Sequence, residues 1–311
     1  MSTADVLFGL RPAPAERLAA LRLVLGGGAL VYTIVRAGHL TAVARHSARQ
    51  FVPVGPVALL GEPLPGAVVI ALVAVTIALG VAFALGWRFR ITGPAFAAAL
   101  LWVTSYRNSW SMVFHTENLM VLHVLVLGCS RAADAWALDA RGRPVPAAHW
   151  RYGWPIELLC RVTVATYLIA GITKLANAGI GWVTSDTLRN FVAYDNLRKI
   201  ELGDLYSPLG VFMVRFDWLF PPLAAVSLLV ELGSPLALVH RRIARLWCAL
   251  AWSFHVGVLA VMWIVFHYPL LGLAYAAFFP LERALVRLPW FARAVASPGS
   301  ASATHADARA E

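Results

Sequence analysis

The sequence predicts an all-α integral membrane protein, a polytopic helix bundle with about eight transmembrane helices. Of its 311 residues, 60% are hydrophobic and only 14% are charged, whereas the surface of a soluble domain of this length needs far more charge. Long apolar runs are the second observation, and residues 66–87 contain no charged side chain. A helix needs about 20 such residues to cross a bilayer, so this run by itself predicts a transmembrane span.

Eight apolar runs are expected to be transmembrane helices. In chain order they are residues 18–36, 66–87, 91–106, 114–130, 155–175, 219–239, 245–264 and 267–281. The third and the last run are short, so bilayer thinning or burial inside the bundle must make up the difference. Arg22 lies one turn into the first run, where its side chain is expected to snorkel to the membrane interface.

The rest of the chain is expected to form termini and connecting loops. Residues 1–17 are predicted to be a cytoplasmic N-terminus without the pattern of a cleaved signal peptide, residues 18–285 the transmembrane domain, and residues 286–311 a disordered cytoplasmic tail. Residues 39–62 are expected to lie along the membrane surface. Residues 176–218 form the longest predicted loop, and their mixed charges and aromatic side chains fit either a solvated loop or a cover over a site.

Arginine and lysine near the ends of the runs predict the orientation in the membrane. Fourteen lie on one side and eight on the other, so the side with more positive charge, which holds both termini, is predicted to be cytoplasmic. The loop 176–218, Lys174 and His115 are then expected at the outer face. The formal net charge of +10 does not indicate nucleic-acid binding, because the arginines lie in short segments between apolar runs and form no single basic face.

Lys174 is the leading candidate for a functional residue. Lysine occurs at only two positions, 174 and 199, and Lys174 ends an apolar run. Helical spacing places it on one face with Tyr167, Ala170 and Gly171, and the two small residues let a helix or a flat ligand approach closely. A desolvated lysine can lose its proton and act as a base, which arginine cannot. The alternative is a lysine that snorkels to the outer interface.

Several other polar residues fall inside apolar runs, where they are costly. His115 and Asn118 share a helical face at the start of the fourth run. His255 lies near the middle of the seventh run, either at a site or as an interhelical hydrogen-bonding residue. His123 is expected to be structural. We therefore expect His115, Asn118 and His255 to be the polar residues closest to an active site or binding site.

The acidic residue Glu231, the histidines as possible metal ligands and the cysteines each have an expected role. Glu231 needs a buried partner, for which Arg241 or a histidine is expected. The histidines lie in different runs without the spacing of a metal site, so no metal is expected. The three cysteines, Cys129, Cys160 and Cys248, are expected to be inert packing residues.

Four segments together resemble a known membrane family. The chain reads YLIAGITKL from Tyr167, FHTENLM from Phe114, SFHVG from Ser253 and ELGSPLAL from Glu231. In order and spacing they are similar to the horizontally transferred transmembrane (HTTM) family, which includes the vitamin K-dependent gamma-glutamyl carboxylase. The resemblance covers most of residues 18–285.

This resemblance implies an enzyme that acts on a quinol or on another lipophilic small molecule. Lys174 stands at the position of the carboxylase lysine that deprotonates vitamin K hydroquinone, and His115 near a histidine that supports that chemistry. We therefore expect Lys174 to be the base and His115 its polar partner, with Tyr167, Asn118 and His255 binding the substrate. The implied cofactor is a reduced quinone, menaquinol or vitamin K hydroquinone.

The chain also departs from the carboxylase. After Leu175 it reads ANAGIGW, without the acidic, tryptophan-containing segment of the carboxylase, and no counterpart of the large extra-membrane region of that enzyme is expected. Glutamate carboxylation by this chain alone is therefore not expected.

Two other function classes compete with an enzyme. The first is a non-catalytic membrane partner or maturation factor for a secreted peptide, in which Lys174 is structural and a peptide or protein is bound. The second, a transporter, is disfavoured because no internal repeat is visible. For each of these function classes, the protein is expected to lie in a lipid bilayer.

Overall fold

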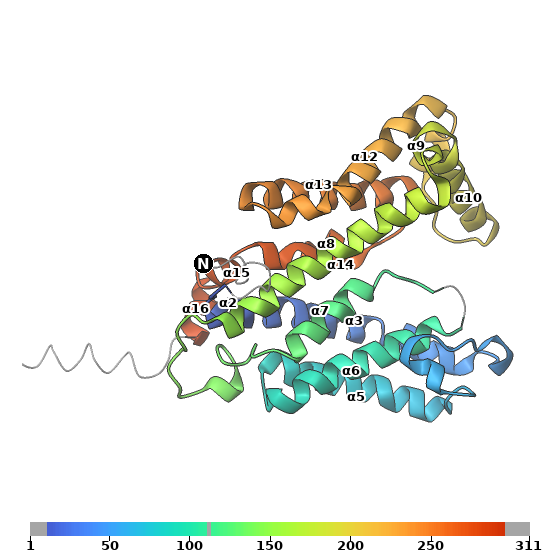
Figure 1. The fold of residues 1–311 in the computed structure, drawn as a ribbon. Helices are drawn as coiled ribbons and strands as arrows, with labels where there is room; N and C mark the ends of the chain where they lie inside the picture. Colours follow the sequence, from blue (N-terminus) through green and yellow to red (C-terminus); the bar gives the residue numbers. More distant parts are fainter. Residues whose placement is uncertain (1–10, 111–112, 296–311) are drawn as a thin grey trace, which may run out of the picture. The chain divides into compact units, whose positions relative to one another are not determined.

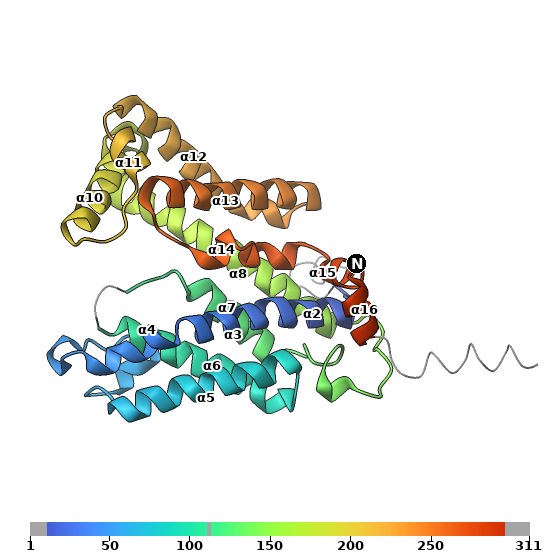
Figure 2. The same ribbon diagram turned by 180° about the vertical axis from the view of Figure 1, so that it is seen from behind.

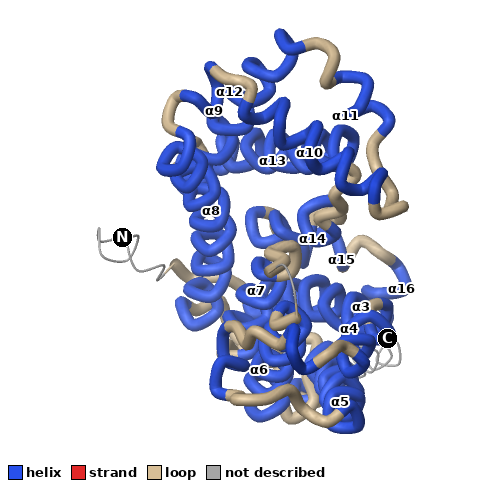
Figure 3. The backbone as a smooth tube through the Cα atoms, turned by 90° about the vertical axis from the view of Figure 1, so that its right-hand side faces the viewer, coloured by secondary structure: helices blue, strands red, loops and turns tan. Residues whose placement is uncertain are grey.

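The fold is all-α over the part of the chain that the structure describes. The structure is a computed structural model, and it describes residues 11–110 and 113–295. These residues form helices joined by loops, with one isolated antiparallel bridge between Ala13 and His149. Figure 3 shows this helical course in blue, with the connecting loops in tan.

The chain divides into two compact units. Unit 1 comprises the described residues up to Phe114 together with Val121–Leu158 and the chain from Phe279 onward, and unit 2 comprises His115–Met120 and Leu159–Phe278. Helix α7 (Asn118–Gly128) and helix α8 (Trp150–Ala178) each contribute residues to both units. Figures 1 and 2 show the helices from opposite sides.

Unit 1 contains the N-terminal helices and the last two helices of the described chain. Its further elements are α2 (Ala15–Leu21), a π-helical turn η1 (Arg22–Gly26), α3 (Gly27–Val35), α4 (Ala37–Ala42), the 3-10 turns η2 (Val43–Arg45), η3 (Ala48–Gln50), η4 (Gly55–Leu59) and η5 (Leu138–Ala140), and the helices α5 (Gly66–Leu85), α6 (Phe89–Asn108), α15 (Leu281–Leu285) and α16 (Pro289–Val295). Helices α5 and α6 pack against each other.

The turn between α5 and α6 is fixed by backbone geometry and one carboxylate. Helix α5 ends at Leu85, and the φ of 64° at the following residue, Gly86, is left-handed and suits glycine. Helix α6 begins where the two oxygens of Asp139 accept hydrogen bonds from the backbone N–H groups of Arg88 at 2.8 Å and Phe89 at 2.7 Å. Asp139 thus caps the helix start and ties η5 to this turn.

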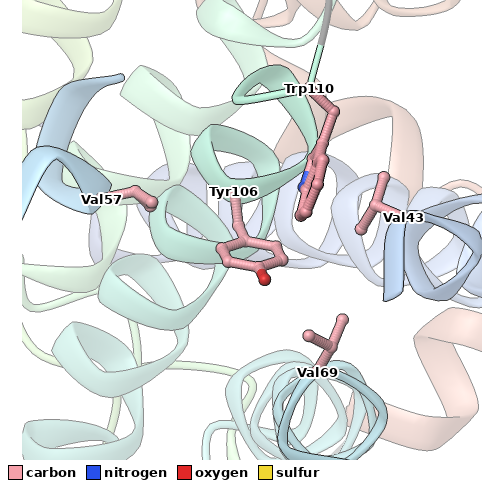
Figure 4. Close-up of a cluster of buried hydrophobic side chains, with 5 residues drawn as sticks. All are labelled: Val43, Val57, Val69, Tyr106 and Trp110. Atoms are coloured by element: carbon pink, nitrogen blue, oxygen red, sulfur yellow. The ribbon is translucent and has the colours of Figure 1, made fainter. Parts of the chain in front are cut away.

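An aromatic cluster forms the core at one end of unit 1. It joins Val43, Val57 and Val69 to Tyr106 and Trp110 of the α6 end (Figure 4). The buried residues Val43 and Val57 belong to the segment 39–62, which the sequence placed along the membrane surface. Part of this segment therefore packs into the core of unit 1.

Arg22 does not snorkel, contrary to the expectation from the sequence. Its side chain is 0% exposed, and its guanidinium donates to the carbonyl oxygens of Ala132 at 2.7 Å and Ala135 at 3.4 Å and to that of Trp136. These carbonyls lie in the segment that follows α7, where backbone acceptors need a donor. Arg22 is a structural anchor within unit 1.

Unit 2 holds the second half of α8 and the following helices. They are α9 (Gly181–Thr184), α10 (Thr187–Glu201), α11 (Pro208–Met213), the 3-10 turn η6 (Asp217–Leu219), α12 (Phe220–Leu232), the 3-10 turn η7 (Ser234–Leu238), α13 (Arg241–Met262), α14 (His267–Leu270) and the 3-10 turn η8 (Leu273–Phe278).

Four described helices are long and apolar enough to cross a membrane. They are Ala15–Val35, Gly66–Leu85, Trp150–Ala178 and Arg241–Met262, and α7 is a shorter apolar helix. The expected number of about eight is not confirmed. The run 219–239 is divided between α12 and η7, where Pro235 cannot donate a backbone hydrogen bond. The run 267–281 contains only α14 and η8, with Gly272 at a φ of 74° between them.

Two segments expected to be irregular are helical. The predicted loop 176–218 contains α9, α10 and α11. The predicted tail 286–311 begins with α16, whose Phe291 is buried and stacks edge-on against Trp136. The remainder of that tail, from residue 296, lies outside the described residues.

Candidate functional site

Lys174 forms a largely buried ion pair with Glu231. The lysine lies near the end of α8 and donates a hydrogen bond from Nζ to Oε1 of Glu231 on α12. The side chain of Glu231 is only 3% exposed and that of Lys174 is 21% exposed. The expectation that Arg241 or a histidine pairs with Glu231 is therefore wrong.

Gly171 explains how the two helices bring these side chains together. A Cβ atom at Gly171 would lie 3.0 Å from Cβ of Glu231 and 2.9 Å from Cδ2 of Leu232. Glycine is thus needed at this crossing of α8 and α12, because a larger residue would push α12 away. The predicted close approach of a neighbouring helix at Gly171 is confirmed.

Two aromatic rings flank the ammonium group of Lys174. Its Nζ lies 5.2 Å from the ring centroid of Trp182 and 5.7 Å from that of Phe254, distances at which a cation is attracted to a ring. Trp182 is oriented by a hydrogen bond from its Nε1 to Oγ of Ser227 at 3.3 Å. The charged atom therefore has one carboxylate and two aromatic rings around it.

A buried hydrogen-bond chain starts from the same face of α8. Tyr167 lies two helical turns before Lys174, and its hydroxyl is 2.8 Å from Nε2 of His255 and 2.7 Å from the hydroxyl of Tyr275. All three side chains are buried, and the Trp247 ring packs edge-on against Tyr167 with centroids 5.1 Å apart. Tyr167 thereby fixes the ring of His255.

His115 lies at the edge of this group and not in its centre. It is exposed, and its ring is 5.5 Å from that of Phe266, which is 4.9 Å from the ring of His255. Phe254, one of the two rings beside Lys174, precedes His255 in the chain, and the centroids of these two rings lie 5.2 Å apart. Asn118 is exposed at the first residue of α7, where its backbone N–H donates to the carbonyl of His115.

Two buried polar atoms of the group have no hydrogen-bond partner within the described structure. They are Oε2 of Glu231 and Nδ1 of His255. Leaving a buried polar group unsatisfied costs about 1–3 kcal/mol, and such an atom in a folded protein calls for an explanation. A ligand with hydroxyl groups could supply the missing hydrogen bonds to both atoms.

The structure thus brings together Lys174, Tyr167 and His255, and it adds residues that sequence reasoning missed. Glu231 was expected to be paired elsewhere, and Trp182 was expected only among the aromatic residues of a loop that covers a site. Phe254 and Tyr275 were given no role. One signal could have found the ion pair, because a lone acid and a lone lysine in apolar runs each need an opposite charge. Among the described residues, no group of three or more His, Cys, Asp or Glu could hold a metal ion.

The comparisons with known proteins give one match. A family model described as the HTTM domain matches residues 10–282. No curated protein and no solved structure matches the chain significantly. The match and the four long apolar helices together indicate an integral membrane protein. Because the family model covers most of the sequence, this chain belongs to the HTTM domain family.

Proposed function

We propose that unit 2 is an acid–base centre for a quinol or another lipophilic small molecule with a hydroxyl group. The observation that carries this proposal is the buried Lys174–Glu231 ion pair with one carboxylate oxygen left without a partner. An ion pair that served stability alone would have its remaining acceptor satisfied, because buried pairs are favourable only when hydrogen-bonded throughout. The free oxygen would accept a hydrogen bond from a ligand hydroxyl.

The ion pair would act as one proton acceptor. A ligand hydroxyl donates to Oε2 of Glu231, and the O–H bond breaks as the proton passes to the carboxylate. The proton stays on Oε2 of Glu231, because the amine of Lys174 in the ion pair is already protonated. The remaining positive charge stabilises the new oxyanion, an electrostatic effect that is strong where water is excluded. The product is the quinol monoanion, and this step involves no change of oxidation state.

The surrounding rings favour a flat, apolar ligand with two polar ends. Trp182, Phe254 and Phe266 supply aromatic surfaces around Lys174 and His255. The unpartnered Nδ1 of His255 is a second polar atom that could bind a hydroxyl. A hydroquinone carries two hydroxyl groups on an aromatic ring, which fits this arrangement. His115, next to Phe266, would assist from the edge of the site.

The orientation in the membrane remains the one that the arginine count favours, with both termini cytoplasmic. Lys174 lies four residues before the end of α8, one of the four candidate spans. A site near a helix end at the outer face would be reached by a ligand that diffuses in the bilayer. This location suits menaquinol or vitamin K hydroquinone better than a water-soluble substrate.

The decisive experiment measures proton transfer and turnover of a quinol in vesicles that contain the full chain. Wild type, Lys174→Ala, Lys174→Arg and Glu231→Gln are compared, with Asn177→Ala as a matched control at an exposed position of α8. Loss of a general acid–base group typically lowers rates about 10²–10⁴-fold, so we expect a loss of this size for Glu231→Gln and for Lys174→Ala, which leaves the carboxylate without its charged partner. Lys174→Arg keeps the charge but has no amine that gives up its proton, so a loss of the same size in this variant would make Lys174 the proton acceptor in place of Glu231.

Other outcomes would contradict the proposal. Equal quinol oxidation or epoxidation in wild type and Lys174→Ala, or none in any variant, would exclude this chemistry. If the substitutions changed only stability and the wild type retained a secreted peptide in a pull-down, the maturation-factor alternative would replace it.

A further inference from the structure

Helix α10 has its polar and apolar faces reversed relative to a helix on a soluble core. Phe191, Tyr194 and Leu197 recur every three residues and are 55%, 68% and 55% exposed. Val192 is buried, but the two other buried residues are polar, Asn196 and Lys199. A surface helix of a soluble protein turns its apolar stripe inward, so this outward stripe indicates an apolar surrounding.

The following segment continues the exposed apolar surface. In α11, Leu209 and Phe212 are exposed, and beyond it so are Phe216 and Trp218. The rings of Phe212 and Phe216 pack edge-on with their centroids 5.3 Å apart. Large exposed apolar surfaces on a monomer mark contact with a membrane or a partner.

The polar side of the same segment caps the end of α13. Lys199 donates from Nζ to Oδ2 of Asp195 at 2.7 Å and to the carbonyl oxygen of Met262. Asn196 donates to the carbonyl of Val261 at 3.1 Å, and Ser207 donates to that of Ala260. These three carbonyls belong to the last turn of α13 and have no acceptor role within the helix, and a lysine is favourable at a helix C-terminus.

This attachment determines where the segment lies relative to a membrane. Helix α13 is one of the four candidate spans, and Met262 is its last residue. A segment that caps the final turn of a span lies at the level where that span leaves the bilayer. Tyrosine and tryptophan are enriched at this level, and the segment exposes Tyr194, Tyr206 and Trp218 there.

Charge argues for lipid tails and against an oppositely charged partner. Between residues 186 and 218 there are four basic and five acidic residues, a formal sum of −1. Several are engaged within the segment, such as Arg198 with Asp195 at 3.3 Å. The segment therefore offers no strongly charged face to a protein or to anionic headgroups, and its affinity for a bilayer would come from apolar burial.

We propose that residues 187–218 form an interfacial membrane element, with the outward face of α10 and α11 inserted among the lipid acyl chains beside the end of α13. The polar face stays on the protein, bound to the last carbonyls of α13. The element holds the end of a transmembrane helix at the membrane surface and is independent of the chemistry at Lys174.

The test is site-directed spin labelling of the full chain in phosphatidylcholine vesicles. Cysteines 129, 160 and 248 are replaced by alanine, and single labels are introduced at Tyr194→Cys and Leu197→Cys, with Asp186→Cys and Asp204→Cys as exposed controls in the same segment. Collision rates with oxygen, which concentrates in lipid, and with a water-soluble nickel chelate are measured. All four positions are exposed, so the labels leave the packing intact.

The proposal predicts an oxygen-to-nickel ratio severalfold higher at 194 and 197 than at 186 and 204. Equal ratios at all four positions would place the face in water and overturn the proposal. Low collision rates with both reagents at 194 and 197 would show that protein covers the face, either a second copy or another chain, and would overturn it as well. The folding of each labelled protein is checked in detergent micelles. Its monodisperse fraction must match that of the unlabelled chain.

Discussion

The two units bury positive charge in different ways. In unit 1, two nitrogens of Arg22 donate to three backbone carbonyls of the segment after α7, and only its Nε has no partner. In unit 2, Lys174 pairs with Glu231, and an acceptor of that carboxylate is left open. An arginine bound by the backbone fixes a fold, whereas an ion pair with an unused acceptor is prepared for a ligand. The difference separates a structural charge from a candidate functional one.

Substituting Arg22 tests the structural half of this comparison and should have the largest effect. In Arg22→Met, three carbonyls lose their donor, and each unsatisfied buried group costs about 1–3 kcal/mol. We expect a loss of several kcal/mol in stability, measured as the midpoint of thermal unfolding in detergent. Quinol binding by the molecules that remain folded should not change. A variant as stable as wild type would show that these carbonyls have other donors.

Separating Lys174 from Glu231 tests the other half. Removing one partner of a buried pair costs about 3–5 kcal/mol, and the partial exposure of Lys174 places both Lys174→Met and Glu231→Leu near the lower end. The double variant should be less destabilised than the sum of the two single variants, because it leaves no unpaired charge. Additive losses in thermal unfolding would mean that the pair does not form.

The crossing of α8 and α12 can be loosened without removing a charged group. In Gly171→Ala the new methyl group meets Leu232 and Glu231 at 2.9–3.0 Å, and overpacking of this kind costs about 1–3 kcal/mol. Gly257→Ala is the matched control in unit 2, because nothing lies within 4 Å of a Cβ atom there. We expect a lower unfolding midpoint and weaker quinol binding only for the first variant. Similar results for both would indicate that α12 is not held against Gly171.

The smallest expected effect belongs to the hydrogen-bond chain. Tyr167→Phe removes the contacts of its hydroxyl with His255 and Tyr275, each worth about 0.5–1.5 kcal/mol. Tyr275→Phe removes only one of them and should cost about half as much. Quinol affinity tests whether Tyr167 positions His255 for the ligand. It should fall more in Tyr167→Phe than in Tyr275→Phe. Equal quinol affinities in the two variants would mean that these hydrogen bonds contribute only to stability.

The all-α class of the fold could be predicted from the sequence because it depends on local patterns, and the same patterns made Lys174 a candidate residue. The run 66–87 became a single helix, Gly66–Leu85, because it is apolar and uninterrupted. The partner of Lys174 could not be found in this way, since Glu231 is 57 positions away and the contact depends on how α8 and α12 cross.

Helix α10 was missed for a different reason. Its buried face carries Asn196 and Lys199 while Phe191 and Tyr194 point outward. Because apolar side chains are normally expected to face inward, a segment with this pattern is predicted to be a mixed-charge loop. Arg22 was misjudged similarly, because its acceptors at residues 132–136 lie more than 100 positions away.

The scarcity of lysine gives the molecule a built-in reporter. Its only two lysines, 174 and 199, lie in unit 2, and each is engaged in an ion pair. Apart from the α-amino group, these two positions are therefore the only amines that an acylating reagent added to the native protein can modify. Their acylation rates, resolved by mass spectrometry, would report local opening at the ion pair with Glu231 and at the end of α13 separately, because each amine reacts only when its hydrogen bonds are broken.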